Sequence, residues 1–178
     1  MQVLTVHTEL GEFDITLAPN QAPITCEYFC ELATEHSLDQ GAIFRITSPV
    51  NHSDKDDHPI GVIQLGLQAG LDATRTTITH ESTDKSGLVH DKWTVSAARF
   101  ELGEVYGSFF ICMREDSALN HGGQRTADGQ GYAAFGTVTD GHDILEQIYA
   151  RAQPQELLDV PISVQTVRLT TPSEANSR

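Results

Sequence analysis

Three short apolar segments of the chain each carry one side chain that can make directional hydrogen bonds. Arg45 lies in the segment IFRI, Gln64 in VIQLG and Arg99 at the end of VSAAR. A guanidinium stays charged at any relevant pH and presents several donors in a planar fork, and an amide can both donate and accept. Because an unpaired buried guanidinium is costly, each arginine must either face solvent or enter a pocket that pairs it. On the pattern alone, the solvent-facing alternative is favoured for Arg45.

Other chemistries have little support in the sequence. It contains no G-x4-G-K, G-x-S-x-G, H-E-x-x-H or C-x2-C motif, which argues against phosphate-loop, hydrolase and zinc-protease mechanisms. The glycine-rich stretch at 122–131 does not follow a strand of a βαβ unit, so we interpret it as a turn-rich loop. The acidic stretch at 52–58 contains Lys55 and lacks the glycine and the terminal glutamate of an EF-hand loop. We therefore expect a solvated loop there, and no metal or other cofactor.

Composition restricts the partners and the compartment. The chain has 178 residues, with 11 Lys and Arg against 25 Asp and Glu, and a formal net charge of −14. Its basic residues are scattered, so we expect no nucleic-acid partner and no membrane partner. No segment approaches about 18 consecutive apolar residues, and no cationic stretch precedes an apolar one near Met1, so we expect neither a transmembrane helix nor a signal peptide. Cys26, Cys30 and Cys112 are odd in number and lie in apolar surroundings, which is typical of reduced, buried thiols in a cytoplasmic protein.

Strands are the main elements that must position these side chains. Residues 2–8 and 13–17 alternate apolar and polar around a turn, which predicts an antiparallel hairpin. Apolar residues at helical spacing predict helices near 22–36 and 141–152. The short apolar segments that remain are separated by Gly, Asp and Ser, and they predict further strands, the last of which ends near Leu169.

The order of these elements predicts the architecture and the domain boundary. Strands before and after two isolated helices, without βαβ alternation, indicate a mainly β barrel or sandwich with helical caps. We place one domain at 1–170 and a polar, flexible tail at 171–178. Two long polar insertions interrupt the domain, at 48–60 and 114–131. Insertions of this length are typical of functional or mobile loops.

A set of ordered motifs resembles one protein family. IFR, VIQLG, TVSAAR, GSFFICM and GQGYAAFGTVTDG follow one another, together with an APIT helix start at 22–25 and the segment HESTDKSGLVHDKWT at 80–94. In this order they resemble the cyclophilin-type peptidyl-prolyl cis-trans isomerases, in particular bacterial members with a long glycine-rich loop before the AAFG strand. The resemblance extends from about Leu4 to Leu169. It implies a closed eight-stranded antiparallel β-barrel capped by two α-helices, one across each open end.

The resemblance also implies a site. Arg45 matches the family's catalytic arginine, and Gln64 matches the glutamine that hydrogen-bonds the substrate backbone. Phe110 matches the aromatic floor of the proline pocket and Leu119 its aliphatic wall. The substrate-binding positions implied in all are Phe44, Val62, Gln64, Ala98, Arg99, Ser108, Phe110, Leu119 and Tyr132.

The chemistry of such a site depends on hydrogen bonding. Rotation about an X–Pro bond faces a barrier of roughly 18–20 kcal/mol, because the nitrogen lone pair is conjugated with the carbonyl. A guanidinium that donates toward the prolyl nitrogen favours a pyramidal, deconjugated nitrogen, and an apolar pocket strengthens that hydrogen bond. We therefore expect Arg45, Gln64 and Phe110 to share one concave surface, and Phe109, the neighbour of Phe110 on its strand, to face the core.

The sequence departs from the family pattern where the pocket is shaped. Gly61 replaces a frequent aromatic residue, Ala97 a frequent Met, and Ser108 a groove-lining Gln. Two hypotheses follow. The first is a prolyl isomerase that acts on proline-containing peptides or unfolded polypeptides during folding, with turnover reduced by these substitutions. The second is a cyclophilin-fold module with a chaperone-like role that binds such peptides with weak or no turnover. In both we expect a cytoplasmic monomer.

Overall fold

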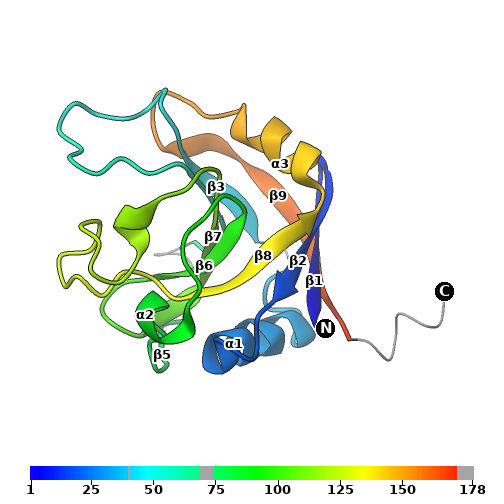
Figure 1. Cartoon of the computed structure of the whole chain (residues 1–178). Helices are drawn as coiled ribbons and strands as arrows, with labels where there is room; N and C mark the ends of the chain where they lie inside the picture. Colours follow the sequence, from blue (N-terminus) through cyan, green and yellow to red (C-terminus); the bar gives the residue numbers. More distant parts are fainter. Residues whose placement is uncertain (40, 69–73, 172–178) are drawn as a thin grey trace.

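A closed antiparallel β-barrel organises the chain (Figure 1). Within residues 1–39, 41–68 and 74–171, which the computed structural model describes, nine strands form one sheet in the order β4-β3-β9-β1-β2-β8-β6-β7-β5. An additional pairing of β4 with β7 closes the first eight into the barrel and leaves β5 at the edge. The strands are β1 (Val3–Thr8), β2 (Gly11–Leu17), β3 (Ala42–Thr47), β4 (Val62–Gly66), β5 (Thr76–Thr77), β6 (Thr94–Arg99), β7 (Glu104–Cys112), β8 (Ala134–Asp140) and β9 (Leu157–Thr170).

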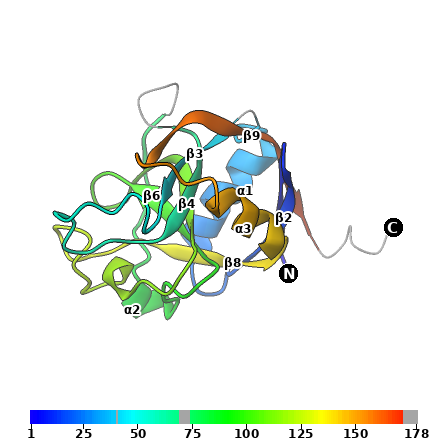
Figure 2. The ribbon, with the colours of Figure 1, turned by 90° about the horizontal axis from the view of Figure 1, so that it is seen from above.

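The two predicted helices are present and cap the barrel. They are α1 (Pro23–Thr34) and α3 (His142–Tyr149), each shorter than expected. Figure 1 shows α1 below the strands and α3 above them, and Figure 2, seen from above, shows α3 in front of α1. The fold is therefore the expected barrel with a helix at each open end. A short helix α2 (Thr83–Ser86) and a 3₁₀ turn η1 (Ser117–Leu119) were not predicted.

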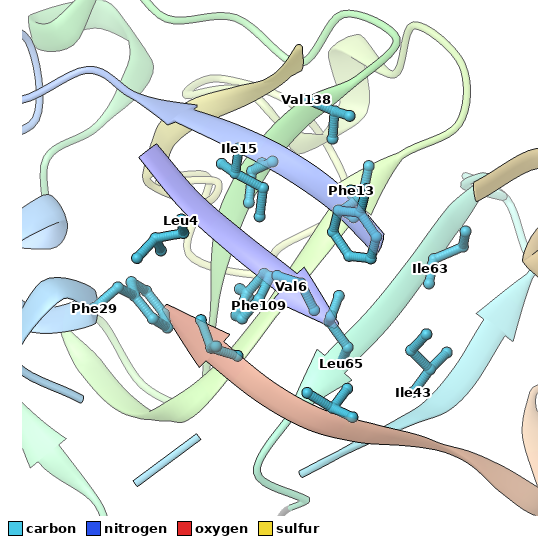
Figure 3. Close-up of a cluster of buried hydrophobic side chains, with 14 of the residues drawn as sticks. Leu4, Val6, Phe13, Ile15, Phe29, Ile43, Ile63, Leu65, Phe109 and Val138 are labelled. Atoms are coloured by element: carbon cyan, nitrogen blue, oxygen red, sulfur yellow. The ribbon is translucent and has the colours of Figure 1, made fainter. Parts of the chain in front are cut away.

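The barrel interior is filled by one apolar cluster, which we call the inner core. Alternate residues of β1 and β2 are buried, as the sequence pattern predicts, and Figure 3 shows Leu4, Val6 and Phe13 among them. From α1, Phe29 enters the same space and stacks on Phe135 with ring centroids 4.5 Å apart. The residues of the inner core are buried and apolar, so its main role is stability.

Three strands of the barrel are buried on both faces. All five residues of β4 are buried, as are most residues of β6 and β7. Their inward faces belong to the inner core, and their outward faces form a second cluster that we call the outer cluster. Its members are Ile60, Val62, Ala98, Tyr106, Phe110, Cys112 and Leu119, with Tyr132 packed against them. The segments VIQLG and SFFICM are apolar at nearly every position because each serves both clusters.

The remaining expectations concern the membrane, the thiols and the tail. Among the described residues, no helix is both long and apolar enough to cross a membrane. All three cysteines are free: Cys26 and Cys112 are buried as expected, but Cys30 is only half-buried. Burial raises the pKa of the Cys26 thiol to about 12 and also raises that of Cys112, so both resist ionisation. Except for residue 171, the tail expected at 171–178 lies outside the described residues.

Candidate functional site

A pocket of about 130 Å³ opens over the outer cluster. Its walls combine apolar side chains with the polar ends of three arginines. It is lined by Arg45, Ile60, Val62, Gln64, Ala98, Arg99, Tyr106, Phe110, Leu119, Arg125 and Tyr132. A larger groove of about 570 Å³ runs along α1, but it is lined by none of the candidate catalytic or substrate-binding residues. The smaller pocket is the candidate site, because convergent polar groups over an apolar floor are typical of ligand sites.

Arg45 enters this pocket from a β-bulge. The pairing of β3 with β4 joins Ile43 to Leu65 and Arg45 to Gln64, so Phe44 is an extra residue in the ladder. Bulges redirect side chains and are common beside functional sites. The Arg45 side chain is 28% exposed, which places it at the rim of the pocket rather than in open solvent. The solvent-facing alternative for Arg45 is therefore wrong.

The Arg45 guanidinium is held by two side chains. Its Nε donates to Oε2 of Glu156 at 2.8 Å, and its Nη2 donates to the same oxygen at 2.6 Å. Its Nη1 donates to Oε1 of Gln64 at 3.3 Å. A guanidinium has five N–H donors, so two of them have no protein partner among the described residues.

Gln64 is oriented by a chain of hydrogen bonds beneath Arg45. Its Nε2 donates to Oη of Tyr106 and to Oγ of Ser108, both at 3.0 Å. The Ser108 hydroxyl in turn donates to the Leu65 carbonyl at 3.2 Å. This network fixes which end of the amide faces Arg45, because only the amide oxygen can accept from a guanidinium.

The floor of the pocket is aromatic and aliphatic. Phe110 lies between the ring of His90, which stacks on it at 6.0 Å, and the ring of Tyr132, which meets it edge-on at 5.2 Å. Leu119 is fully buried, and its carbonyl accepts from the Tyr132 backbone N–H at 3.0 Å. Gly131 has a φ of +64° and lies against the Leu119 carbonyl, where a side chain has no room. This close backbone approach keeps Leu119 and Tyr132 together at the pocket.

His90 supports the floor from behind. Its Nδ1 lies 2.7 Å from Oδ1 of Asn120, and its Nε2 lies 2.9 Å from Oγ of Ser96. The residue is 1% exposed, and burial lowers its pKa to about 4, so the ring is neutral at pH 7.

The two polar insertions meet at the pocket and bind each other. Arg125, from the second insertion, lines the pocket and donates to Asp56 of the first at 3.1 Å and to the His58 carbonyl at 3.2 Å. Arg114 donates to the Pro59 carbonyl. Most of the acidic stretch at 52–58 is exposed, as expected for a solvated loop, and its Asp56 carboxylate also pairs with an arginine of the pocket wall.

The space near Gly61, where the sequence lacks an aromatic residue, is not empty. A side-chain carbon at Gly61 would lie 2.9 Å from the Tyr149 hydroxyl and 3.3 Å from Cδ of Arg114. The backbone N–H of Gly61 donates to Asp116 at 2.9 Å. Ile60, the preceding residue, supplies an apolar side chain to the pocket wall.

Arg99 fixes the opposite wall. Its side chain is 6% exposed, with Nη2 donating to Oδ1 of Asp128 at 2.8 Å and Nε donating to the Gly131 carbonyl at 2.9 Å. The hydrogen bond from Arg99 is the main reason that the pKa of Asp128 falls to about 2. The Arg99 guanidinium also lies 5.4 Å from the centre of the Tyr132 ring. Arg99 thus ties the glycine-rich insertion to β6.

The structure brings most of the predicted site residues to one place. Those that line the pocket are Arg45, Val62, Gln64, Ala98, Arg99, Phe110, Leu119 and Tyr132. Phe44 is buried at the bulge and does not line the pocket, and neither does Ser108, which is fully buried and orients Gln64. Both were expected as substrate-binding positions, and the structure does not bring either of them to the pocket lining. As expected, Phe109 belongs to the inner core and Phe110 to the pocket.

Sequence reasoning missed four residues of the site. These are Ile60, Tyr106, Arg125 and Glu156. Ile60 and Arg125 lie in the polar insertions, whose length had pointed to function without indicating which side chains are involved. Glu156 lies 111 residues from Arg45 in the chain, and no local pattern connects the two.

The closed barrel with a helix at each end and an arginine-rimmed apolar pocket outside one wall is an architecture of the cyclophilin type. The family model described as cyclophilin type peptidyl-prolyl cis-trans isomerase/CLD matches residues 3–169. The chain therefore belongs to the cyclophilin-type peptidyl-prolyl cis-trans isomerases.

Named relatives support the assignment. The chain is 27% identical over 150 residues to peptidyl-prolyl cis-trans isomerase cyp18 of Streptomyces antibioticus, covering 83% of each protein. It is 26% identical over 178 residues to peptidyl-prolyl cis-trans isomerase B of Escherichia coli strain K12, covering 97% of this chain and 100% of the relative. Among solved structures, a cyclophilin type peptidyl-prolyl cis-trans isomerase of Cryptosporidium parvum, crystallised in the presence of the dipeptide Ala-Pro, shares the fold with a TM-score of 0.72 at 17% identity. That match covers 95% of this chain and 99% of the other.

Proposed function

We propose that the pocket over the outer cluster is the site at which this isomerase holds the proline ring of a polypeptide and catalyses rotation about the X–Pro bond. The observation that carries the proposal is the position of the Arg45 guanidinium, which has two N–H groups without a protein partner among the described residues and lies above the floor made by Phe110 and Leu119. A volume of about 130 Å³ suits one small ring rather than a drug-sized ligand, for which pockets of roughly 300–1,000 Å³ are usual.

The bound proline ring packs against Phe110 and Leu119, with the prolyl nitrogen toward Arg45. As the bond twists, conjugation is lost and the nitrogen lone pair becomes available as an acceptor. An N–H of Arg45 then donates to the nitrogen and stabilises the twisted state more than either planar one, which lowers the barrier. The step needs no covalent bond and no proton transfer, so the guanidinium is unchanged at the end.

Gln64 has a more restricted role than the resemblance implies. Both donors of its amide are occupied by Tyr106 and Ser108, and its oxygen accepts from Arg45. It can bind substrate backbone only through a remaining lone pair or by exchanging one of these bonds. We assign it first to holding Arg45 in place and second to substrate binding.

The proposed substrates are proline-containing segments of unfolded polypeptides in the cytoplasm. Three free thiols are usual in a reducing compartment. We further propose that the protein acts as a monomer.

A protease-coupled assay on a short X–Pro peptide tests the proposal. Arg45→Ala removes the donor, and kcat/KM should fall by roughly 10²–10³-fold, as for other transition-state donors. Arg151→Ala is the matched control, because Arg151 is exposed and outside the pocket, and it should retain wild-type activity. Equal activity of wild type and Arg45→Ala would refute the mechanism. If both proteins only matched the buffer rate but bound the peptide, the chain would be a binding module instead.

A further inference from the structure

Glu156 is fixed beside Arg45 by main-chain contacts. It directly precedes β9, and its backbone carbonyl accepts from the Ile46 N–H at 2.9 Å. The next residue, Leu157, pairs with Arg45 in the β3–β9 ladder after the bulge. These contacts place Glu156 next to Arg45 independently of its own side chain.

The connection from α3 to β9 that carries Glu156 is itself braced. Asn51 donates from Nδ2 to the carbonyl of Gln153 at 2.9 Å and to that of Ile46 at 2.8 Å. The backbone N–H of Asp159 donates to the Gln153 side chain at 2.9 Å. Figure 1 shows this orange connection meeting the cyan loop after β3. Glu156 therefore lies in a connection that is held by hydrogen bonds to neighbouring segments.

The carboxylate determines which way the guanidinium fork points. Oε2 of Glu156 accepts from both Nε and Nη2 of Arg45, and a planar group that is bonded along one edge cannot rotate about its long axis. Gln64 accepts from Nη1. With three of the five donors fixed, the directions of the other two are fixed as well.

We propose that Glu156 is a positioning residue of the isomerase site, which orients Arg45 so that its two remaining N–H groups face the bound X–Pro bond. This inference rests on the proposed function of the pocket. Glu156 itself touches Arg45 and not the substrate, and its side chain is 36% exposed at the rim. Its effect is geometric, because transition-state stabilisation by a hydrogen-bond donor depends on pre-organised direction.

Variants of Glu156 separate this role from a general effect on folding. Glu156→Ala frees the guanidinium, so kcat should fall by roughly 10–100-fold with KM changed by less than about threefold. Glu156→Gln keeps an acceptor oxygen at the same distance and should restore most of kcat. Glu146→Ala is the matched control, since Glu146 is also exposed and pairs with a cation, Lys92, but lies outside the pocket. It should leave kcat unchanged.

Two further measurements complete the test. The ¹⁵N–¹Hε signal of Arg45, assigned with Arg45→Lys, should be protected from water exchange in the wild type and in Glu156→Gln, and exchange fast in Glu156→Ala. The double variant Arg45→Ala/Glu156→Ala should be no slower than Arg45→Ala alone, because the two residues act as one unit. An unchanged kcat in Glu156→Ala, beside an inactive Arg45→Ala, would overturn the inference and leave the proposed function standing. An active Arg45→Ala would instead overturn the proposed function.

Discussion

The inner core and the outer cluster lie on opposite faces of the same three strands, yet they differ in what surrounds them. The inner core is enclosed by the barrel and its two helices and consists of apolar side chains. The outer cluster is of similar chemistry but carries three arginines at its edge and opens into a pocket. Side-chain alternation along β7 places the consecutive residues Phe109 and Phe110 in different clusters. The fold thus keeps stability and reactivity on different faces of one sheet.

The buried polar side chains around the outer cluster are paired with one another, so a pocket can open there without leaving a buried polar group unsatisfied. Among the described residues, no buried side-chain nitrogen or oxygen lacks a hydrogen-bond partner. Gln64 in the pocket wall, and His90, Ser96 and Ser108 behind it, all have partners. Because each group is satisfied, the pocket is pre-organised before substrate arrives.

The comparison predicts its largest effect for Phe109→Ala. The ring is fully buried in the inner core, 5.4 Å from that of Phe29, and its loss leaves a cavity. The free energy of unfolding should fall by roughly 3–5 kcal/mol, measured by urea denaturation. Activity per folded molecule should change little. A loss of less than about 1 kcal/mol would mean that the inner core does not dominate stability.

Acid should act on the outer cluster through His90. Burial holds the pKa of its folded state at about 4, against about 6.5 in an unfolded chain. Between these values the unfolded state binds a proton that the folded state does not, so stability declines as pH falls from 6.5 to 4 and not further below 4. Over the whole interval, the uptake of this proton by the unfolded state lowers the free energy of unfolding by about 3 kcal/mol, at about 1.4 kcal/mol per pH unit.

Replacing His90 with an uncharged residue separates its effect on acid stability from the effect of protonating Asp and Glu side chains. His90→Gln cannot take up the proton, so its urea midpoint should fall less than that of the wild type between pH 6.5 and 4. The two profiles should run in parallel above pH 7. Parallel profiles over the whole range would show that His90 does not control the acid response.

Of these three changes, Phe110→Ala should have the smallest effect in free energy, and it should act on function more than on stability. The ring forms the pocket floor, so kcat/KM should fall by roughly 10–100-fold in the protease-coupled assay, equivalent to about 1.4–2.7 kcal/mol. Its cost in stability should be below that of Phe109→Ala, because one side of Phe110 already faces the pocket. A reversed order, with Phe110→Ala the less stable protein, would contradict the division between the two clusters.

The sequence predicts the barrel well because its strands alternate and its motifs are ordered. The hairpin of β1 and β2, both long helices and the positions of Arg45, Gln64 and Phe110 follow from those patterns. The short helix α2 does not, since four residues are too few to show a helical period. Phe44, which the resemblance implied as a substrate-binding position, is the extra residue of a bulge, and periodicity alone gives no sign of that bulge.

The ion pairs of the site that sequence analysis did not predict share a physical cause. The Arg45–Glu156 and Arg125–Asp56 pairs join residues that are far apart in the chain. Each pair is created by strand register and loop packing, so neither partner has a local signal. Ser108, expected as a substrate-binding position, is internal because its short side chain bonds to Gln64 and to the β4 backbone.

The place of β9 between β1 and β3 sets the order in which the molecule can be completed during synthesis. Val3 pairs with Thr170, and β3 pairs with β9 rather than with β1, so the wall closes only after the last strand has left the ribosome. Such sequence-distant pairing slows folding, because the loop-closure entropy is lost before the contacts form. Glu156 reaches Arg45 in the same step. If Arg45 acts as proposed, the nascent chain has no oriented arginine, and activity should appear only when the barrel is finished.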